Sequence, residues 1–421
     1  MSAVPVRNPS SRNTSPTRPG TSSRTPRKAL LLVAVAIALA ALNLRTAITS
    51  VGPVLDEVTH GLGMTAVGAG VLTTLPVLCF ALFGGLTPLL ARRLGSHHLL
   101  VYALTALTIG LTLRALAPEP VLFLTLSVVA LSGGAIGNVI LPALVKQHFP
   151  HRVGLMTTVY TTGLALGTAI AAAATVPMEQ ATGQWRLAIG VYALFGLAAV
   201  LPWLLALRHE PTSNGEGPAL GVRRVLSTGL GWQGVLYFGT QSTIAYIMFG
   251  WFAQMLRDQG MDAQSAGVML AYLTALGIPM SLVLPALIVR VRDQRPFVVL
   301  FVLSYTIGFL GLWSSPLAGT WVWTTFIGVG MGSFVLALTI FAVRTRTAEG
   351  TAAMSASSQS LGYLLGGVGP FLFGLLHELT GGWHAPLAMV MGIVALNLVV
   401  GLLVGRPRYL EDAIAEQDAR A

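Results

Sequence analysis

One arginine, Arg45, lies in the middle of the first long apolar run of the chain. If that run forms a helix of about 28 residues beginning at Leu30, the rise of 1.5 Å per residue places Arg45 about 22 Å into a bilayer. A guanidinium at this depth costs several kcal/mol unless it faces a cavity or a partner. It could bind an anion through paired hydrogen bonds. The alternative is that it donates to oxygens of neighbouring helices and only holds them together.

Acidic residues do not share the predicted depth of Arg45. The candidates all lie near the ends of apolar runs: Asp56, Glu57, Glu119, Glu179, Asp258, Asp262 and Glu378. A buried cation without a resident counter-ion is arranged to receive an anion, so the sequence predicts an anion site at Arg45. The eight histidines also fall in loops or at helix ends. The sequence therefore shows no proton relay of buried Asp, Glu or His.

Neutral polar residues near Arg45 are further candidates for the site. Thr49 comes one helical turn later and shares the face of Arg45. Asn43 points about 160° away on an ideal helix, so it either contributes to the site or ties two helices together. Asn138 follows a run of glycines that lets backbones approach closely, and its amide either faces the pocket or makes an interhelical hydrogen bond.

The composition shows which elements must position these residues. Of the 421 residues, 54% are hydrophobic and 10% are charged, and the mean hydropathy is +0.74. The apolar residues occur in runs of about 20 or more, the length of a bilayer helix. These features predict an all-α polytopic membrane protein and exclude a soluble enzyme. The single cysteine, Cys79, excludes an intramolecular disulfide and a cysteine metal site, and we expect no cofactor.

Twelve transmembrane helices are predicted. Their expected ranges are 30–57, 65–91, 97–116, 120–145, 152–177, 185–207, 230–256, 264–289, 296–313, 319–343, 350–376 and 384–405. Prolines inside four of them, Pro76, Pro142, Pro279 and Pro370, predict kinks.

The positive charges indicate the topology. A net charge of +10 would normally suggest nucleic-acid binding. However, 21 of the 25 Lys and Arg residues, including Lys146, fall on one side of the predicted bundle, and only Arg114, Arg186 and Arg257 fall on the other. This distribution is the positive-inside pattern. We therefore expect a bacterial inner-membrane protein with both termini cytoplasmic, a lipid environment and no nucleic-acid partner.

The chain divides into two related halves. We expect a basic tail at 1–28, a six-helix half at 29–207, a cytoplasmic linker at 208–225, a second half at 226–405 and a tail at 406–421. "GMTAVGAGVL" from Gly63 and "GMDAQSAGVM" from Gly260 match at six of ten positions with an offset of 197. This pattern predicts a parallel repeat of six plus six helices, with the substrate at the interface between the halves.

The repeat adds candidates from the second half. The offset of 197 pairs Arg45 with the neutral Ser242, so Gln241 and Tyr237 are expected to complete the site opposite the arginine. An offset of 199 pairs Tyr160 with Gln359, as expected of site-lining positions, although both could equally serve packing. Tyr246 and Tyr272 are read more simply as core or interface aromatics.

Three stretches resemble one family. "LNLRTAITSVGPVL" from Leu42, "GVLTTLPVLCFALFG" from Gly70 and "LPALVKQHFPHRVGLMTTVYTTGLALG" from Leu141 are similar to the cyanate/nitroimidazole transporter (CynX/NimT) family of the major facilitator superfamily. The superfamily motif after the second helix is degraded here, with Arg92 in place of its Asp. The resemblance implies secondary transport of small polar or anionic solutes by a protein that is complete as a monomer.

Two alternatives to anion transport remain. Efflux of lipophilic or cationic drugs, or of nitroimidazoles, would predict a large apolar cavity with an acidic residue, and the sequence places no acidic residue at that depth. A membrane enzyme would need paired acids or a metal-ligand cluster, and the only outer acidic pair, Asp56 and Glu57, has no nearby histidine beyond His60. The chain contains no Walker-type phosphate loop, so ATP is not expected to drive transport directly.

Overall fold

The computed structural model describes residues 27–149, 152–206 and 222–419, and every regular element in these ranges is a helix. The first half contains α1 (Arg27–Asn43), α2 (Thr46–Thr49), η1 (Gly52–Val54), α3 (Leu55–Leu62), α4 (Ala66–Leu94), α5 (Ser96–Leu116), α6 (Pro120–His148), α7 (Val153–Thr182), α8 (Trp185–Gly190) and α9 (Tyr192–Ala206). The second half contains α10 (Val222–Leu226), α11 (Gly229–Asp258), α12 (Ala263–Ala275), α13 (Gly277–Val289), α14 (Arg295–Ser314), α15 (Thr320–Gly330), α16 (Ser333–Val343), α17 (Ala348–Gly366), α18 (Val368–Thr380), α19 (His384–Val404) and α20 (Leu410–Asp418).

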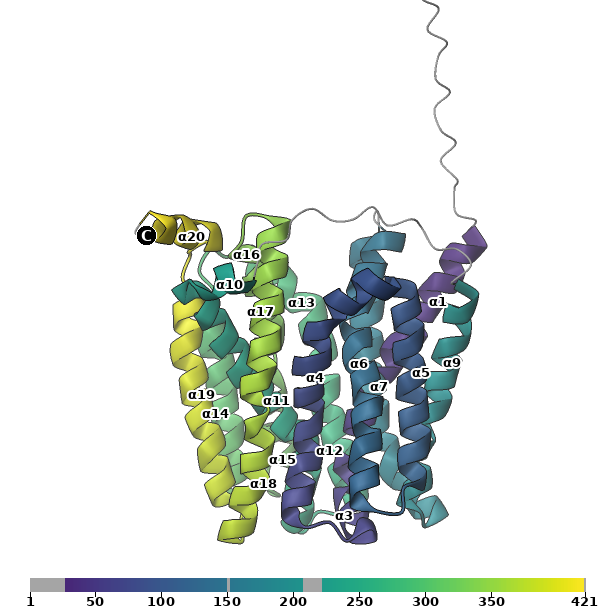
Figure 1. Cartoon of the computed structure of the whole chain (residues 1–421). Helices are drawn as coiled ribbons and strands as arrows, with labels where there is room; N and C mark the ends of the chain where they lie inside the picture. Colours follow the sequence, from purple (N-terminus) through teal and green to yellow (C-terminus); the bar gives the residue numbers. More distant parts are fainter. Residues whose placement is uncertain (1–26, 150–151, 207–221, 420–421) are drawn as a thin grey trace, which may run out of the picture.

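The long helices form one bundle (Figure 1). Within the described residues, eleven helical stretches are long and apolar enough to span a membrane. The 30-residue α11 runs through the bundle beside them and carries several Gln, Ser, Thr and Tyr side chains. It tolerates these side chains because most of its residues are buried against other helices instead of facing lipid. With α11 included, the twelve predicted helices and the all-α membrane fold are confirmed.

Several predicted spans are interrupted. The first span, Leu30–Leu62, is not the continuous helix that the sequence predicts, because α1 ends at Asn43 and the chain continues through α2, η1 and α3. Pro53 in η1 cannot donate the hydrogen bond of a helix interior. Further breaks separate α12 from α13, α15 from α16 and α17 from α18. Pro279 and Pro370 lie just after two of these breaks, whereas Pro76 and Pro142 lie inside the continuous helices α4 and α6.

The repeat is visible in local structure. α4 begins at Ala66 and α12 at Ala263, an offset of 197. Both helices are capped by the preceding residue: the Thr65 hydroxyl accepts a hydrogen bond from the amide of Gly68, and the Asp262 carboxylate accepts one from the amide of Ser265. The two halves thus start their second spans in the same way.

The glycines that the repeat pairs also make equivalent contacts. A Cβ at Gly167 would lie 1.8 Å from the carbonyl oxygen of Leu42, and one at Gly366 would lie 3.1 Å from the carbonyl oxygen of Gly239. Leu42 and Gly239 are themselves separated by 197 positions. Both glycines therefore allow close packing of the first helix of a half against its fifth, and the two-repeat fold is confirmed at the level of single contacts.

The halves meet along two equivalent seams. In one seam α4 packs against α17 and α18, and in the other α7 packs against α12 and α13. Each seam contains one glycine of a pair that the repeat relates, Gly70 and Gly267. A Cβ at Gly70 would lie 3.2 Å from Phe371, and one at Gly267 would lie 3.0 Å from the carbonyl oxygen of Ala172. This arrangement places a pseudo-two-fold axis between the halves.

Figure 1 places the start of α1, helix α10 and helix α20 on one face of the bundle, which we call the terminal face, and α3 on the opposite face. The predicted segments 1–28 and 208–225 lie largely outside the described residues. The predicted tail at 406–421 contains α20, which is tied to the terminal face by ion pairs from Asp412 to Arg346 and from Asp418 to Arg224.

Candidate functional site: a central cavity at Arg45

A cavity of about 530 Å³ lies between the two halves. Its lining reaches from Arg45 to Thr157, Val289 and Ala342, near the ends of their helices on the terminal face. The polar and aromatic residues that line it are Arg45, Thr157, Thr158, Thr161, Thr168, Gln241, Ser242, Tyr246, Phe249, Thr274, Ser281, Phe334, Thr339 and Tyr363, and the remainder are apolar or glycine. The lining described by the structure contains no acidic residue. A negatively charged solute would therefore meet no repelling carboxylate on the cavity wall.

Arg45 lies in the break between α1 and α2. Its carbonyl accepts hydrogen bonds from the amides of Ile48 and Thr49, at 3.0 and 3.1 Å, so its backbone starts the short second helix. Its side chain is half-buried, and its Nε atom has no hydrogen-bond partner in the described structure. No Asp or Glu of the described residues forms an ion pair with it. The guanidinium is therefore available to an anionic ligand.

Two aromatic rings of the second half flank the guanidinium. The Cζ atom of Arg45 lies 5.9 Å from the ring centroid of Phe249 and 5.8 Å from that of Phe334. Such cation–π contacts stabilise a guanidinium while leaving its N–H groups free to donate. The charge of one half thus faces apolar rings of the other.

Gln241 is the second predicted residue that lines the cavity. Its Oε1 atom accepts a hydrogen bond of 2.7 Å from the hydroxyl of Tyr305, and its Nε2 atom lies 3.5 Å from the carbonyl oxygen of Met331. The amide is thereby held in place on α11. Tyr305 lies on α14, and no signal in the sequence connects it with Gln241.

The other predicted residues of the first half lie outside the lining of this cavity. Asn43 is fully buried and accepts a hydrogen bond of 2.8 Å from Thr46 at its Oδ1 atom. The Thr49 hydroxyl donates to the carbonyl of Arg45 at 3.1 Å. The Tyr160 hydroxyl donates to Asn138 Oδ1 at 3.0 Å, and this bond joins α7 to α6. These contacts hold the broken first span and its neighbours together, and a role in binding stays a prediction.

Two predicted residues of the second half are also absent from the lining. Gln359 donates to the Ser355 hydroxyl at 2.7 Å, one turn earlier on α17. Tyr237 is fully buried, and a Cβ added at Gly401 would lie 2.8 Å from its ring, which places the ring against α19. The pairing of Tyr160 with Gln359 therefore does not bring the two residues together at the cavity.

The sequence reasoning missed most of the cavity wall. Thr157, Thr158, Thr161 and Thr168 present a polar stripe along α7, and their helical spacing could have identified it. Tyr246 and Tyr363 line the same cavity, although the sequence reading treated Tyr246 as a packing aromatic and did not consider Tyr363. Phe249 and Phe334 have no distinguishing sequence signal, because aromatic residues are common in any helix core.

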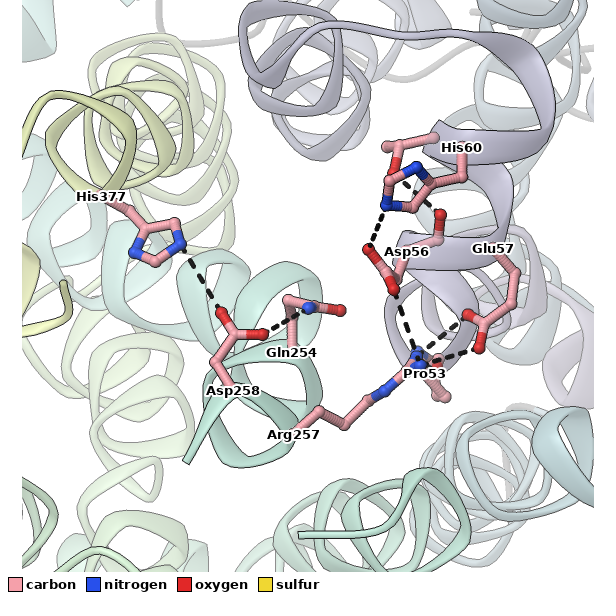
Figure 2. A network of polar contacts seen from close by, with 9 residues as sticks. Pro53, Asp56, Glu57, His60, Gln254, Arg257, Asp258 and His377 are labelled. Carbon is pink, nitrogen blue, oxygen red and sulfur yellow. Dashed lines mark hydrogen bonds and ion pairs between the residues drawn. The ribbon is translucent and has the colours of Figure 1, made fainter. Parts of the chain in front are cut away.

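The end of the bundle opposite the terminal face is closed by an ion-pair network between the halves, shown in Figure 2. Arg257, at the end of α11, donates to both carboxylate oxygens of Glu57 at 2.9 and 2.8 Å and to the carbonyl of Pro53 at 3.2 Å. Asp56 lies 3.9 Å from the same guanidinium. Glu57 and Pro53 belong to the first half and Arg257 to the second, so the network fastens one half to the other.

Arg114 is a buried arginine that the sequence reasoning counted only as an outer positive charge. It lies in the last turn of α5, within the predicted span 97–116, and is only 1% exposed. Its guanidinium donates to the carbonyl of Ala47 at 3.0 Å and to the hydroxyl of Ser50 at 3.3 Å. The break after α1 frees such groups from helical hydrogen bonding, and an apolar run does not predict where the break falls.

The chain matches the family model of the Major Facilitator Superfamily over residues 31–370. It therefore belongs to that superfamily and is an integral membrane transporter of a small solute.

The relatives define the branch. The chain is 36% identical to the uncharacterized transporter YycB of Bacillus subtilis, with 88% of this chain and 92% of that protein covered. It is 33% identical to the 2-nitroimidazole transporter of Escherichia coli over 90% of this chain and 97% of that protein. The cyanate transport protein CynX of the same organism is 26% identical over 88% of this chain and 96% of that protein. These matches confirm the resemblance to the cyanate/nitroimidazole family.

The fold has solved counterparts. A bacterial homologue of the human lysosomal transporter Spinster, described as inward-facing and unoccupied, superposes with a TM-score of 0.70 at 15% identity over 92% of this chain and 98% of that chain. This similarity supports the fold alone.

Proposed function

We propose that the protein is a secondary transporter of a small anion or a small polar solute, with Arg45 as the central binding residue. The observation that carries the proposal is the half-buried guanidinium of Arg45, which faces a cavity without an acidic lining residue. Its flanking Phe249 and Phe334 rings leave its N–H groups unused. An anion can take these donors in the paired geometry that a guanidinium favours.

The shape of the cavity favours a cargo with an apolar part. Its volume of about 530 Å³ lies within the range that holds drug-sized ligands. A three-atom anion such as cyanate would contact Arg45 but would leave most of the wall, including Tyr246 and Tyr363, without a partner. A planar carboxylate or another planar anion could bind Arg45 with its charged end and lay its body against the aromatic rings. We therefore rank small organic anions above inorganic ones.

Transport would proceed by alternating access. The positive-inside pattern makes the terminal face cytoplasmic, so the cavity is open toward the cytoplasm and the Arg257–Glu57 network closes the outer end. Separation of this network, together with closure of the terminal face, would expose Arg45 to the outside. The helix breaks beside the cavity lining, near Gly277 and Met331, provide points where such rocking can bend the second half.

A second candidate is the export of a neutral nitroaromatic compound. The largely apolar lining of the cavity and the similarity to the 2-nitroimidazole transporter favour it. A nitro group carries partial negative charge on two oxygens, so Arg45 could bind it as a dipole. In that case transport would depend less on a full negative charge of the cargo.

The test is flux through the full-length protein in liposomes. We would measure uptake of cyanate, nitrate, bicarbonate, short carboxylates, benzoate and 2-nitroimidazole, each with and without an imposed proton gradient. Saturable uptake of benzoate or another carboxylate supports the proposal. Saturable movement of 2-nitroimidazole alone supports the second candidate, and the absence of flux for every compound in the panel would contradict both.

A further inference from the structure

Arg114 is a second buried cation, and it does not line the central cavity. Two of its donors are used, by the carbonyl of Ala47 and the hydroxyl of Ser50, whereas its Nε atom has no hydrogen-bond partner. Among the described residues no Asp or Glu forms an ion pair with it. Complete burial of a guanidinium without a counter-charge is costly, since two neutral acceptors replace only part of its hydration.

A small separate cavity of about 20 Å³ is lined in part by Arg114. Ser127, which is fully buried, lines the same cavity, and its hydroxyl also lacks a hydrogen-bond partner. Thr73 contributes a third polar side chain, whose hydroxyl donates to the carbonyl of Gly70 at 3.0 Å. The residues that line the cavity therefore include a buried arginine with an unused N–H donor and a buried serine with an unused hydroxyl.

The size and chemistry of the cavity limit its occupant. One water-sized particle needs roughly 10–15 Å³, so 20 Å³ holds one such particle and excludes a molecule of several heavy atoms. Arginine donates and cannot accept, and a hydroxyl can donate as well. A particle of one atom that accepts hydrogen bonds and carries negative charge is a halide ion. We propose that this cavity is a chloride site formed by Arg114 and Ser127.

The position of the site connects it to the conformation of the transporter. Tyr246 and Gly250 of the second half complete its wall, and Tyr246 also lines the central cavity. The wall is tight between the halves: a Cβ at Gly52 would lie 2.5 Å from the carbonyl oxygen of Phe249, and one at Gly250 would lie 2.9 Å from Thr73. If the halves separate at the outer end, this wall opens. Chloride bound at Arg114 therefore stabilises the conformation that is closed at the outer end.

The first test is thermal stability of the purified full-length protein. We expect a saturable rise of the Tm with sodium chloride or sodium bromide, compared with sodium gluconate at equal ionic strength. Arg114→Gln should raise the halide concentration that gives half of the Tm rise by at least about tenfold. Ser127→Ala leaves the charge in place and should raise this concentration less. Arg186→Gln, which removes a partly exposed arginine near the same end, is the matched control and should respond like wild type.

The second test locates the ion and covers the case in which Arg114→Gln does not fold. In bromide-soaked crystals of the wild-type protein, anomalous scattering should place one bromide within hydrogen-bond distance of Arg114 Nε and Ser127 Oγ. Arg45→Ala should retain both this peak and the Tm response. A water in the cavity without an anomalous peak would overturn the proposal. A halide response that Arg45→Ala abolishes would overturn it as well, because the ion would then occupy the central site.

Discussion

The guanidinium of Arg257 and the carboxylate of Glu57 form a two-bonded ion pair that joins the two halves of the transporter (Figure 2). Their side chains are only 17% and 25% exposed, so water screens the pair less than it would screen a surface pair. The offset of 197 pairs Glu57 with Gln254, which lies one turn before Arg257 on α11. The ends of the first spans of the two halves, which the repeat relates, thus each supply one partner of this ion pair.

We predict that Arg257→Gln shifts the protein away from the state closed at the outer end. The lost pair is worth about 1–3 kcal/mol, which corresponds to roughly a 5- to 150-fold change in the ratio of the two states. A cysteine introduced by Thr73→Cys in a Cys79→Ala background should react faster with a membrane-impermeant maleimide added outside. Arg186→Gln is the control, and Glu57→Arg combined with Arg257→Glu should restore slow labelling. Unchanged labelling in Arg257→Gln would show that this pair does not hold the outer end closed.

The closed state also requires a small residue at Gly52. A Cβ there would lie 2.5 Å from a backbone oxygen of the opposite half, a contact that separation of the halves would relieve. Gly52→Leu is therefore expected to increase labelling of the cysteine introduced by Thr73→Cys by at least as much as Arg257→Gln does. Gly84→Leu is a suitable control, because a Cβ at Gly84 would meet its nearest neighbour, Val139, at 3.7 Å. Normal labelling and flux in Gly52→Leu would contradict this arrangement of the outer end.

The paired packing glycines should differ in tolerance. A Cβ at Gly167 would lie 1.8 Å from the Leu42 carbonyl oxygen, whereas one at Gly366 would lie 3.1 Å from the Gly239 carbonyl oxygen. We expect Gly167→Ala to destabilise the protein by about 1–3 kcal/mol through overpacking, and Gly366→Ala to cost less. Thermal unfolding in detergent measures the difference. Equal Tm values for the two variants would mean that the first half relaxes more easily than its packing suggests.

The C-terminal helix α20 should detach in acid. Burial alone would raise the pKa of Glu411, but hydrogen bonds from the amides of Arg346 and Thr347 and from the Thr347 hydroxyl lower it below its ordinary value of 4.5. Because the pKa is lowered in the folded state, the carboxylate stabilises docking at neutral pH, and this contribution is lost as the pH falls through that lowered value. Protection of the amides of 410–418 from hydrogen exchange, measured relative to an unfolded chain at the same pH, should fall at this pH. Glu411→Gln should already show the low protection at pH 7. Slow exchange in Glu411→Gln at pH 7 would assign the docking to the other ion pairs of α20.

The lengths of the apolar runs and the internal repeat were sufficient to predict the fold. Runs of bilayer length predicted twelve helices, because the thickness of the hydrocarbon core sets the length of a span. The repeat between Gly63 and Gly260 predicted their division into two halves. Prolines pointed to the breaks near Pro279 and Pro370. The break at Arg45 was not predictable, because it depends on the neighbours that accept its free backbone groups. Arg114 illustrates this dependence, since its donors contact the segment that follows the break.

The candidate site was predicted only in part. Arg45 and Gln241 line the cavity. Both could be predicted, because burying a charge or an amide at membrane depth is costly unless it faces a cavity or a partner. Asn138 and Tyr160 hydrogen-bond each other instead of facing the cavity. From sequence, a polar residue that binds a ligand and one that ties two helices look alike, since both satisfy the same hydrogen-bonding demand.

The central claim is that Arg45 binds the anionic part of the cargo, and substrate flux in liposomes tests it most directly. With the best substrate of the panel, Arg45→Ala should abolish saturable uptake, and Arg45→Lys should retain the charge but reduce uptake at least about tenfold, because an ammonium cannot reproduce the paired hydrogen bonds. Arg290→Ala, which removes an exposed arginine on the terminal face, should transport normally. Normal uptake in both Arg45 variants would contradict the account and leave Arg45 as a packing residue.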